Sequence, residues 1–162
     1  MLVVTQRSEA RRQVDGVLRL PFDLRCKSRL RTALVSGEEL ALFLARGEVL
    51  RDGECLLAED GRVVRVEAQA EAVLQVSCRD ARELARVAYH LGNRHVPLQV
   101  GDGWLRLRDD HVLLAMVQRL GATVERCHLP FEPEAGAYGD HAHQAAAPTH
   151  GGVIHEFVGK RS

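Results

Sequence analysis

The chain has 162 residues and a mass of 18.0 kDa, enough for one ordinary domain or two small ones. Its 22 Lys and Arg residues balance 22 Asp and Glu residues, which disfavours a general nucleic-acid or membrane-surface binder, because such proteins carry a basic excess. Hydrophobic residues make up 46%, so the chain can build a core. The unusual feature is eight histidines, of which four fall in the last part of the chain: His141, His143, His150 and His155.

The apolar stretches are far shorter than the roughly 18–20 residues that span a bilayer, and the first residues lack the pattern of a signal peptide. We therefore predict a cytoplasmic protein without a membrane segment. The four cysteines are scattered and form no Cys-x-x-Cys pair, which disfavours a thiolate zinc site or a redox motif. They are interpreted as small buried hydrophobic residues.

Residues 1–70 are predicted to form an all-β domain. Apolar or small residues alternate with cations from Leu24 to Leu34, which predicts a strand with one basic face. Residues 40–44 and 62–66 are further strand candidates, and glycines lie between them at turn-like spacing. The basic face is either an ordinary solvated surface or a docking site for an acidic partner, and its members are Arg25, Lys27, Arg29 and Arg31.

Residues 71–137 show a different pattern. A strand at 73–78 precedes a helix that opens at Asp80, with an apolar face at positions 81, 84, 85, 88 and 91 and a stop at Gly92-Asn93. A hairpin is expected around Gly101-Asp102-Gly103, then a helix capped by Asp109 or Asp110, then a strand at 123–129. This order is the ferredoxin-like βαββαβ arrangement, so the fold class is α+β. Residues 138–162, rich in Ala, Gly and His, are predicted to be a flexible tail.

No motif indicates catalysis. The chain has no glycine-rich phosphate loop, no Gly-x-Ser-x-Gly elbow, no His-Glu-x-x-His helix and no nucleophile with an evident base. We therefore expect a protein that is not an enzyme.

The histidines are candidate metal ligands, because imidazole suits nickel, copper, zinc and iron. His95 lies between a helix stop and Pro97, on a short, stiff connection that presents its ring to solvent or to a partner. His90 and His111 lie off the apolar faces of the two helices. For His90, His95 and His111, the alternative to a metal ligand is an ordinary solvent-exposed residue. His141 and His143 are two apart, so an extended segment would place both imidazoles on one side. A solubilising tail without a metal is the alternative there.

Four segments resemble one known family. The run Gly92-Asn93-Arg94-His95-Val96-Pro97, within residues 88–100, looks like the signature of the urease accessory protein UreE, a family of nickel metallochaperones. Residues 110–121 resemble its second helix, 130–138 its exit from the last strand, and 20–29 part of its N-terminal half. The resemblance runs from about residue 18 to 139.

This resemblance implies a homodimer in which His95 of each subunit binds Ni²⁺ at the interface, with His141 and His143 as further ligands. It places secondary metal positions at His90 and His111. Zn²⁺ or Cu²⁺ can substitute at such imidazole sites. The implied partners are the urease apoprotein complex and its accessory GTPase, with no nucleic acid and no membrane. A metal-independent adaptor or protein-binding chaperone is the alternative, and an RNA-binding sheet is disfavoured because only Trp104 is a candidate for base stacking.

Overall fold

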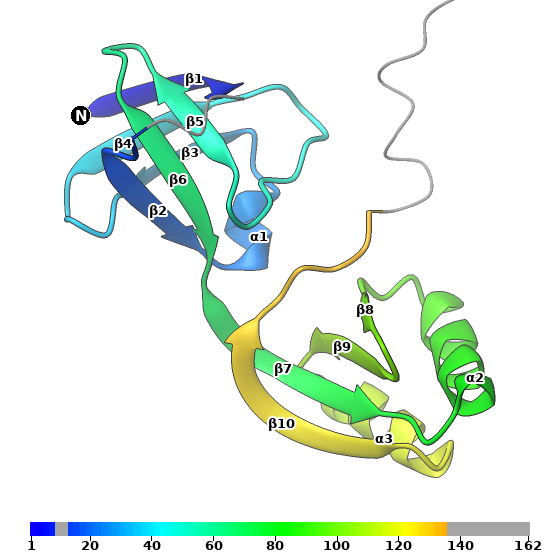
Figure 1. The fold of residues 1–162 in the computed structure, drawn as a ribbon. Helices are drawn as coiled ribbons and strands as arrows, with labels where there is room; N and C mark the ends of the chain where they lie inside the picture. The colour runs from blue at the N-terminus through cyan, green and yellow to red at the C-terminus, as the bar shows by residue number, and fades with distance from the viewer. Residues whose placement is uncertain (9–12, 136–162) are drawn as a thin grey trace, which may run out of the picture.

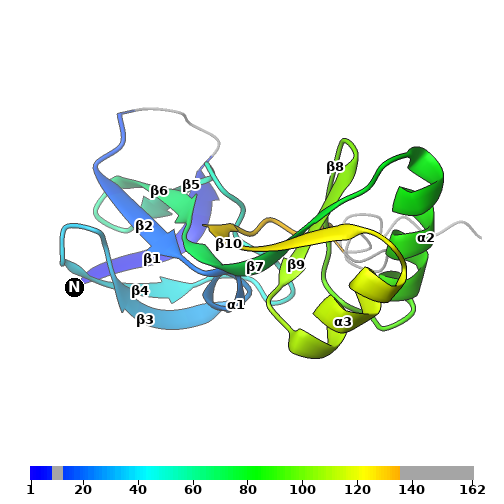
Figure 2. The same ribbon diagram turned by 90° about the horizontal axis from the view of Figure 1, so that it is seen from below.

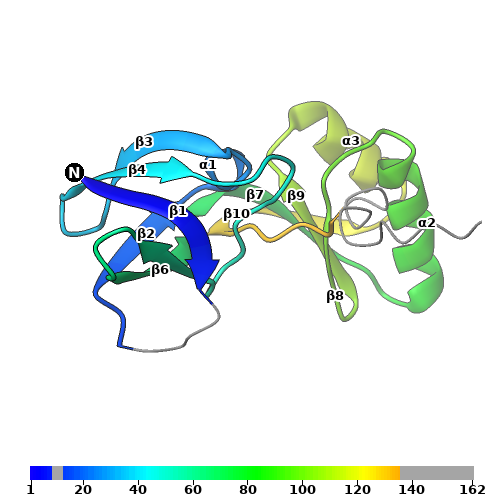
Figure 3. The ribbon, with the colours of Figure 1, turned by 90° about the horizontal axis from the view of Figure 1, so that it is seen from above.

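The structure, a computed structural model, describes residues 1–8 and 13–135, which form two β-sheets that each carry their own core (Figure 1). The two units lie end to end (Figures 2 and 3). None of the described helices is long and apolar enough to cross a membrane.

The N-terminal unit is a six-stranded sheet in the order β2-β6-β5-β1-β4-β3, in which β1 pairs parallel with β4 and β2 pairs parallel with β6. Its core consists of buried aliphatic side chains from these strands, including Val4, Leu18 and Leu40. The strands expected at 40–44 and 62–66 are present. The elements are β1 (Leu2–Ser8), β2 (Gly16–Leu20), α1 (Phe22–Arg25), β3 (Arg29–Ala33), β4 (Glu39–Phe43), β5 (Cys55–Ala58) and β6 (Val63–Ala68).

The predicted strand from Leu24 to Leu34 is wrong in its first half. Residues 22–25 form the single helical turn α1 after Pro21, and the strand β3 begins only at Arg29. Arg25 therefore does not belong to a basic strand face: its side chain is fully buried, because carbonyl and carboxylate groups distant in the sequence surround it. The exposed cations of this segment are Lys27, Arg29 and Arg31.

The C-terminal unit has the expected order strand-helix-strand-strand-helix-strand, and its antiparallel sheet has the order β10-β7-β9-β8. Leu74 and Val76 of β7 and Leu105 and Leu107 of β9 point to the face that the helices cover, where they join one buried cluster. The elements are β7 (Ala70–Ser77), α2 (Ala81–Gly92), β8 (Gln99–Gly101), β9 (Trp104–Arg108), α3 (His111–Arg119) and β10 (Thr123–Pro130).

The predicted helix starts are confirmed. The Asp80 carboxylate accepts a hydrogen bond from the Glu83 amide at 2.8 Å, and Asp110 accepts from the amides of Val112 and Leu113. These backbone donors, Leu113 first, hold the pKa of the Asp110 carboxyl below its ordinary value. The hairpin is also confirmed, since Gly101 pairs with Trp104 and Gly103 has a φ of +77°.

The buried face of α2 matches the predicted one in part, because Leu84, Ala88 and Leu91 pack into the C-terminal core as expected. Val87 and Leu91 are fully buried, whereas Ala81 and Ala85 are exposed. Glu83 is also buried, because its carboxylate turns back to accept from the Arg79 amide and guanidinium. The alanines fit either face, so the larger Val87 determines which side of the helix packs on the sheet.

The two units contact each other around the short link between β6 and β7. The Glu71 carboxylate accepts from the Phe22 amide at 2.8 Å, and Arg108 forms an ion pair with Asp23. The Phe22 ring meets the ring of Phe131, which follows β10, edge to face at 5.4 Å. Side chains of α1 therefore lie at the junction of the units.

Candidate metal centre

His95 lies in the connection between α2 and β8, where the helix end and the following strand anchor it. The Arg94 amide donates to the Leu91 carbonyl at 3.0 Å, and the His95 amide donates to the Gly92 carbonyl at 2.9 Å. Val96 and Leu98, on the other side of His95, pack against the C-terminal core. The chain is thus held before and after His95, while the His95 side chain is exposed.

The His95 backbone has a left-handed conformation, with a φ of +54°. It is the only described residue other than glycine with a positive φ. Gly92, at the end of α2, has an ordinary φ and does not serve as the left-handed helix stop. This conformation costs an L-residue roughly 1–2 kcal/mol, and such strain occurs often at functional sites.

We expect a protein with His95→Gly to be about 1 kcal/mol more stable than one with His95→Ala, because glycine adopts a positive φ without a steric penalty. Urea denaturation of the two variants measures the difference. The same pair of substitutions at Asn93, whose φ is −62°, provides the control, and there alanine should be the more stable. Equal stability of the two position-95 variants would contradict the left-handed geometry.

His90 and His111 lie on different helices. His90, in the last turn of α2, is half-buried rather than exposed as predicted, and its ring meets that of Tyr89 at 5.5 Å. His111 is exposed at the first residue of α3, next to the cap Asp110. His141 and His143, like His150 and His155, lie outside the described residues.

Within residues 1–8 and 13–135, no three His, Cys, Asp or Glu side chains come close enough together to hold a metal ion. His90, His95 and His111 therefore do not form one ligand cluster. A centre with three protein ligands that includes His95 therefore draws on residues outside 1–8 and 13–135 or on a second chain.

The four cysteines are free thiols, and none of them joins a group of three potential metal ligands among the described residues. None of the four is fully buried, contrary to the prediction, and Cys26 is exposed. Desolvation raises the pKa of the Cys26 and Cys78 thiols.

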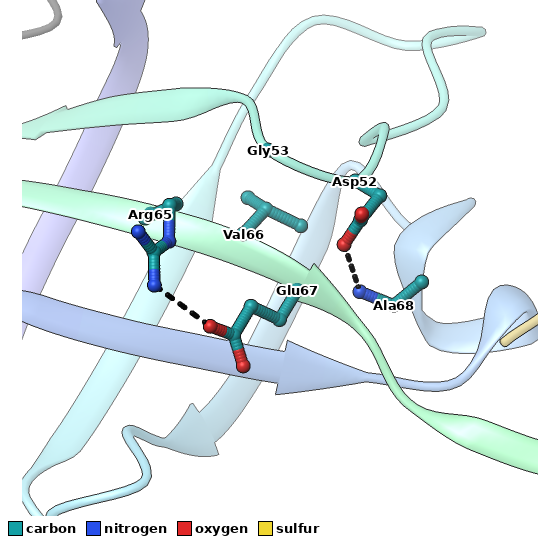
Figure 4. A pocket seen from close by; sticks show the side chains of 6 residues that line it. All are labelled: Asp52, Gly53, Arg65, Val66, Glu67 and Ala68. Atoms are coloured by element: carbon teal, nitrogen blue, oxygen red, sulfur yellow. Dashed lines mark hydrogen bonds and ion pairs between the residues drawn. The ribbon is translucent and has the colours of Figure 1, made fainter.

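A shallow hollow on the N-terminal sheet is not a metal centre either (Figure 4). The Asp52 carboxylate accepts from the Ala68 amide at 2.7 Å, and Glu67 pairs with Arg19 and Arg65 at 2.9 Å each. Both carboxylates are thus already satisfied. The hollow is lined by Asp52, Gly53, Arg65, Val66, Glu67 and Ala68.

The sequence pattern missed the groups that hold the segment after β10. Arg25 donates to the carbonyls of Leu20 and Leu50, to the Phe131 carbonyl and to the Glu132 carboxylate. Arg51 donates to the Pro133 carbonyl at 2.6 Å. In the sequence, only Pro130 and Pro133, on either side of Glu132, hinted that this segment has a fixed path.

The described residues thus form two small units, and an exposed histidine with a left-handed backbone lies in the second of them. Comparison with known proteins identifies the family. The family model described as the UreE urease accessory protein, N-terminal domain, matches residues 3–69, and that of the C-terminal domain matches residues 71–157. The chain belongs to the UreE family of urease accessory proteins, and it is an accessory protein, not an enzyme.

Relatives support this membership over most of the chain. The urease accessory protein UreE of Azotobacter vinelandii is 54% identical over 153 residues, which cover 94% of this chain and 90% of the relative. The UreE of Ectopseudomonas mendocina is 57% identical, over 86% of this chain and 84% of the relative. The UreE of Pseudomonas fluorescens strain Pf0-1 is 56% identical, over 90% of this chain and 88% of the relative.

Proposed function

We propose that this protein is a cytoplasmic nickel-binding metallochaperone that delivers Ni²⁺ for assembly of the urease metallocentre. The observation that carries the proposal is His95: an exposed imidazole on an anchored, left-handed turn, with no completing ligand set among the described residues. Membership of a family of urease accessory proteins supports urease as the destination of the Ni²⁺.

A homodimer would supply two of the ligands of the proposed metal centre. A two-fold axis brings the same residue together from both chains, so two copies supply two His95 imidazoles. Large apolar side chains that remain exposed on the C-terminal unit support such an interface: Tyr89 is 66%, Val112 52% and Val100 49% exposed. Tyr89 lies in the last turns of α2, close in sequence to His95.

His141 and His143 are proposed as the remaining ligands, with His90 and His111 as secondary positions. An all-imidazole, incompletely filled shell exchanges its metal more readily than a closed thiolate site, which suits delivery. The same ligands accept Zn²⁺ or Cu²⁺. The sheet order β10-β7-β9-β8 supports assigning the metal-binding domain to the ferredoxin-like class.

Nickel titration of the purified full-length protein tests the function. We expect His95→Ala to weaken tight nickel binding by at least 100-fold, because each dimer loses both fixed ligands, and urease activation should fall with it. His128→Ala, which removes an exposed imidazole from β10, is the matched control and should bind nickel like the parent. Unchanged nickel binding by His95→Ala would contradict the His95 centre. Urease activation that survives the loss of both His95 and residues 138–162 would favour the metal-independent adaptor instead.

The partner surface is proposed to include Lys27, Arg29 and Arg31, which are exposed on or beside the edge strand β3. The acidic surface that they fit would belong to the urease apoprotein complex or its accessory GTPase. Arg31 already pairs with Glu39 at 3.1 Å, so Lys27 and Arg29 are the informative positions.

We expect Lys27→Glu combined with Arg29→Glu to slow association with the urease apoprotein complex about tenfold at low salt, because like charges repel across the interface. Raising the salt concentration should narrow the difference. Arg82→Glu combined with Arg119→Glu makes the same charge change at exposed helical positions of the other unit. An equal association rate for the two double variants would rule out this surface as the docking site.

A further inference from the structure

Residues 130–134 form an extended segment, here termed the strap, that crosses the open face of the C-terminal sheet. Gln75, Arg106 and Gln99 are cross-strand neighbours on β7, β9 and β8, and they lie on the face opposite to Leu74 and Leu105. Arg106 donates to the Gln75 side chain at 2.8 Å and to the Pro130 carbonyl at 2.7 Å. The strap therefore lies on the sheet face away from the helices.

The strap carries the chain from one edge of the sheet to the other. It leaves β10 at one edge, and at the opposite edge its Glu132 amide donates to the Gln99 side chain at 3.0 Å. The Glu134 amide then donates to the Leu98 carbonyl at 2.7 Å. Leu98 is three residues after His95, so the described chain ends beside the connection that carries His95 (Figures 1 and 2).

The N-terminal unit holds the strap in this path. The fully buried Arg25 binds the Phe131 carbonyl and the Glu132 carboxylate, while Arg51 binds the Pro133 carbonyl and lies 3.7 Å from the other Glu132 oxygen. Phe131 and Pro133 are buried. The strap thus contacts both units, and two arginines of the N-terminal unit satisfy its polar groups.

We infer that the strap is a guide that starts the C-terminal segment beside His95, and that Arg25, Arg51 and Glu132 are positioning residues for metal binding. This inference rests on the proposed function, in which His141 and His143 complete the His95 centre. It also means that the N-terminal unit, although it holds no proposed ligand, affects metal affinity through the strap.

The distances support the need for such a guide. Six residues lead from Ala135 to His141, and six residues of any chain span at most about 20 Å. The strap crosses the width of a four-stranded sheet, about 14 Å at the usual strand spacing. If the segment started at the β10 edge instead, the effective concentration of its imidazoles at His95 would fall about fivefold.

The test uses the full chain with the pair Arg51→Ala and Glu132→Gln, which loosens the strap at partly exposed positions and leaves Arg25 in place. The control pair is Arg19→Ala and Glu67→Gln, which removes an exposed arginine–glutamate pair from the N-terminal sheet. Hydrogen exchange of the Glu134 amide reports on the strap, and nickel titration reports on the centre. The same substitutions are repeated in a His141→Ala, His143→Ala background.

We expect the Glu134 amide to be protected in the parent and in the control, and to exchange at least tenfold faster in the strap pair. Nickel binding by the strap pair should weaken about fivefold, and this loss should vanish when His141 and His143 are absent. A merely structural role would weaken binding in both backgrounds. A Glu134 amide that is unprotected in the parent, or equally protected in the strap pair, would overturn the guide, as would unchanged nickel affinity.

These outcomes are separable from a failure of the proposed function. If the parent binds nickel through His95 but the strap pair binds equally well, the guide is wrong and the metallochaperone stands. If His95→Ala leaves nickel binding intact, the metallochaperone centre is wrong, and the guide fails with it as a metal-positioning device even where the Glu134 amide is protected.

Discussion

Replacing Arg25 by Ala is expected to lower the free energy of unfolding by about 3–5 kcal/mol, because the change leaves buried partners without their donor. The Arg25 guanidinium satisfies carbonyls from three separate parts of the chain, at Leu20, Leu50 and Phe131. It also faces the Glu132 carboxylate, which would lose its buried counter-ion. Urea denaturation, followed by circular dichroism, measures the change.

Arg19→Ala provides the matched control for this prediction. Arg19 pairs with Glu67 at 2.9 Å, but its side chain is 52% exposed, so water replaces the lost partner. Its removal should cost no more than about 1 kcal/mol. An Arg25→Ala variant as stable as Arg19→Ala would show that Arg25 does not join the two units. Arg25→Lys should also be destabilised, because one ammonium group cannot reach the several acceptors that a guanidinium fork meets.

Replacing Phe131 by Ala is expected to cost about 3–5 kcal/mol, the usual effect of deleting a fully buried aromatic ring. Phe131 is completely buried, and it meets Phe22 of α1 edge to face. The substitution therefore removes apolar contact between the strap and the N-terminal unit. Thermal unfolding measured by calorimetry should show the loss as a lower midpoint.

Phe43→Ala is the comparison, because Phe43 is 50% exposed at the end of β4. Its loss should change stability by no more than about 0.5 kcal/mol. If both phenylalanine variants unfold at the same midpoint, the apolar junction between strap and α1 contributes nothing. Phe131→Ala combined with Arg25→Ala should cost less than the sum of the single changes, since the two residues hold the same segment.

Local patterns predicted the C-terminal unit well. Asp80 and Asp110 cap their helices as expected, and Gly103 takes the positive φ that a tight hairpin needs. These features depend on hydrogen bonds within four residues of the chain, so nearby sequence contains the information. The buried face of α2 was predicted only in part: Leu84, Ala88 and Leu91 pack as expected, but Val87 was missed because several alanines allow more than one face.

The candidate metal ligands show the same contrast between what nearby sequence predicts and what packing decides. The position of His95 after a helix end and before Pro97 was evident, but its left-handed backbone was not, since the pattern suggested that Gly92 would reverse the chain. His90 is half-buried, which depends on the neighbouring Tyr89 ring and the packing of α2.

The sequence by itself determined most strands and helices, the family and the histidine on which the proposed centre rests, because periodicity, caps and motif residues act over short stretches. Only the tertiary structure decided the role of Arg25 and the path of the strap. The alternation from Leu24 to Leu34 placed Arg25 on an exposed strand face, whereas its partners come from Leu50, Phe131 and Glu132. A buried charge requires acceptors that surround it in space, and these come from parts of the chain that no local period connects.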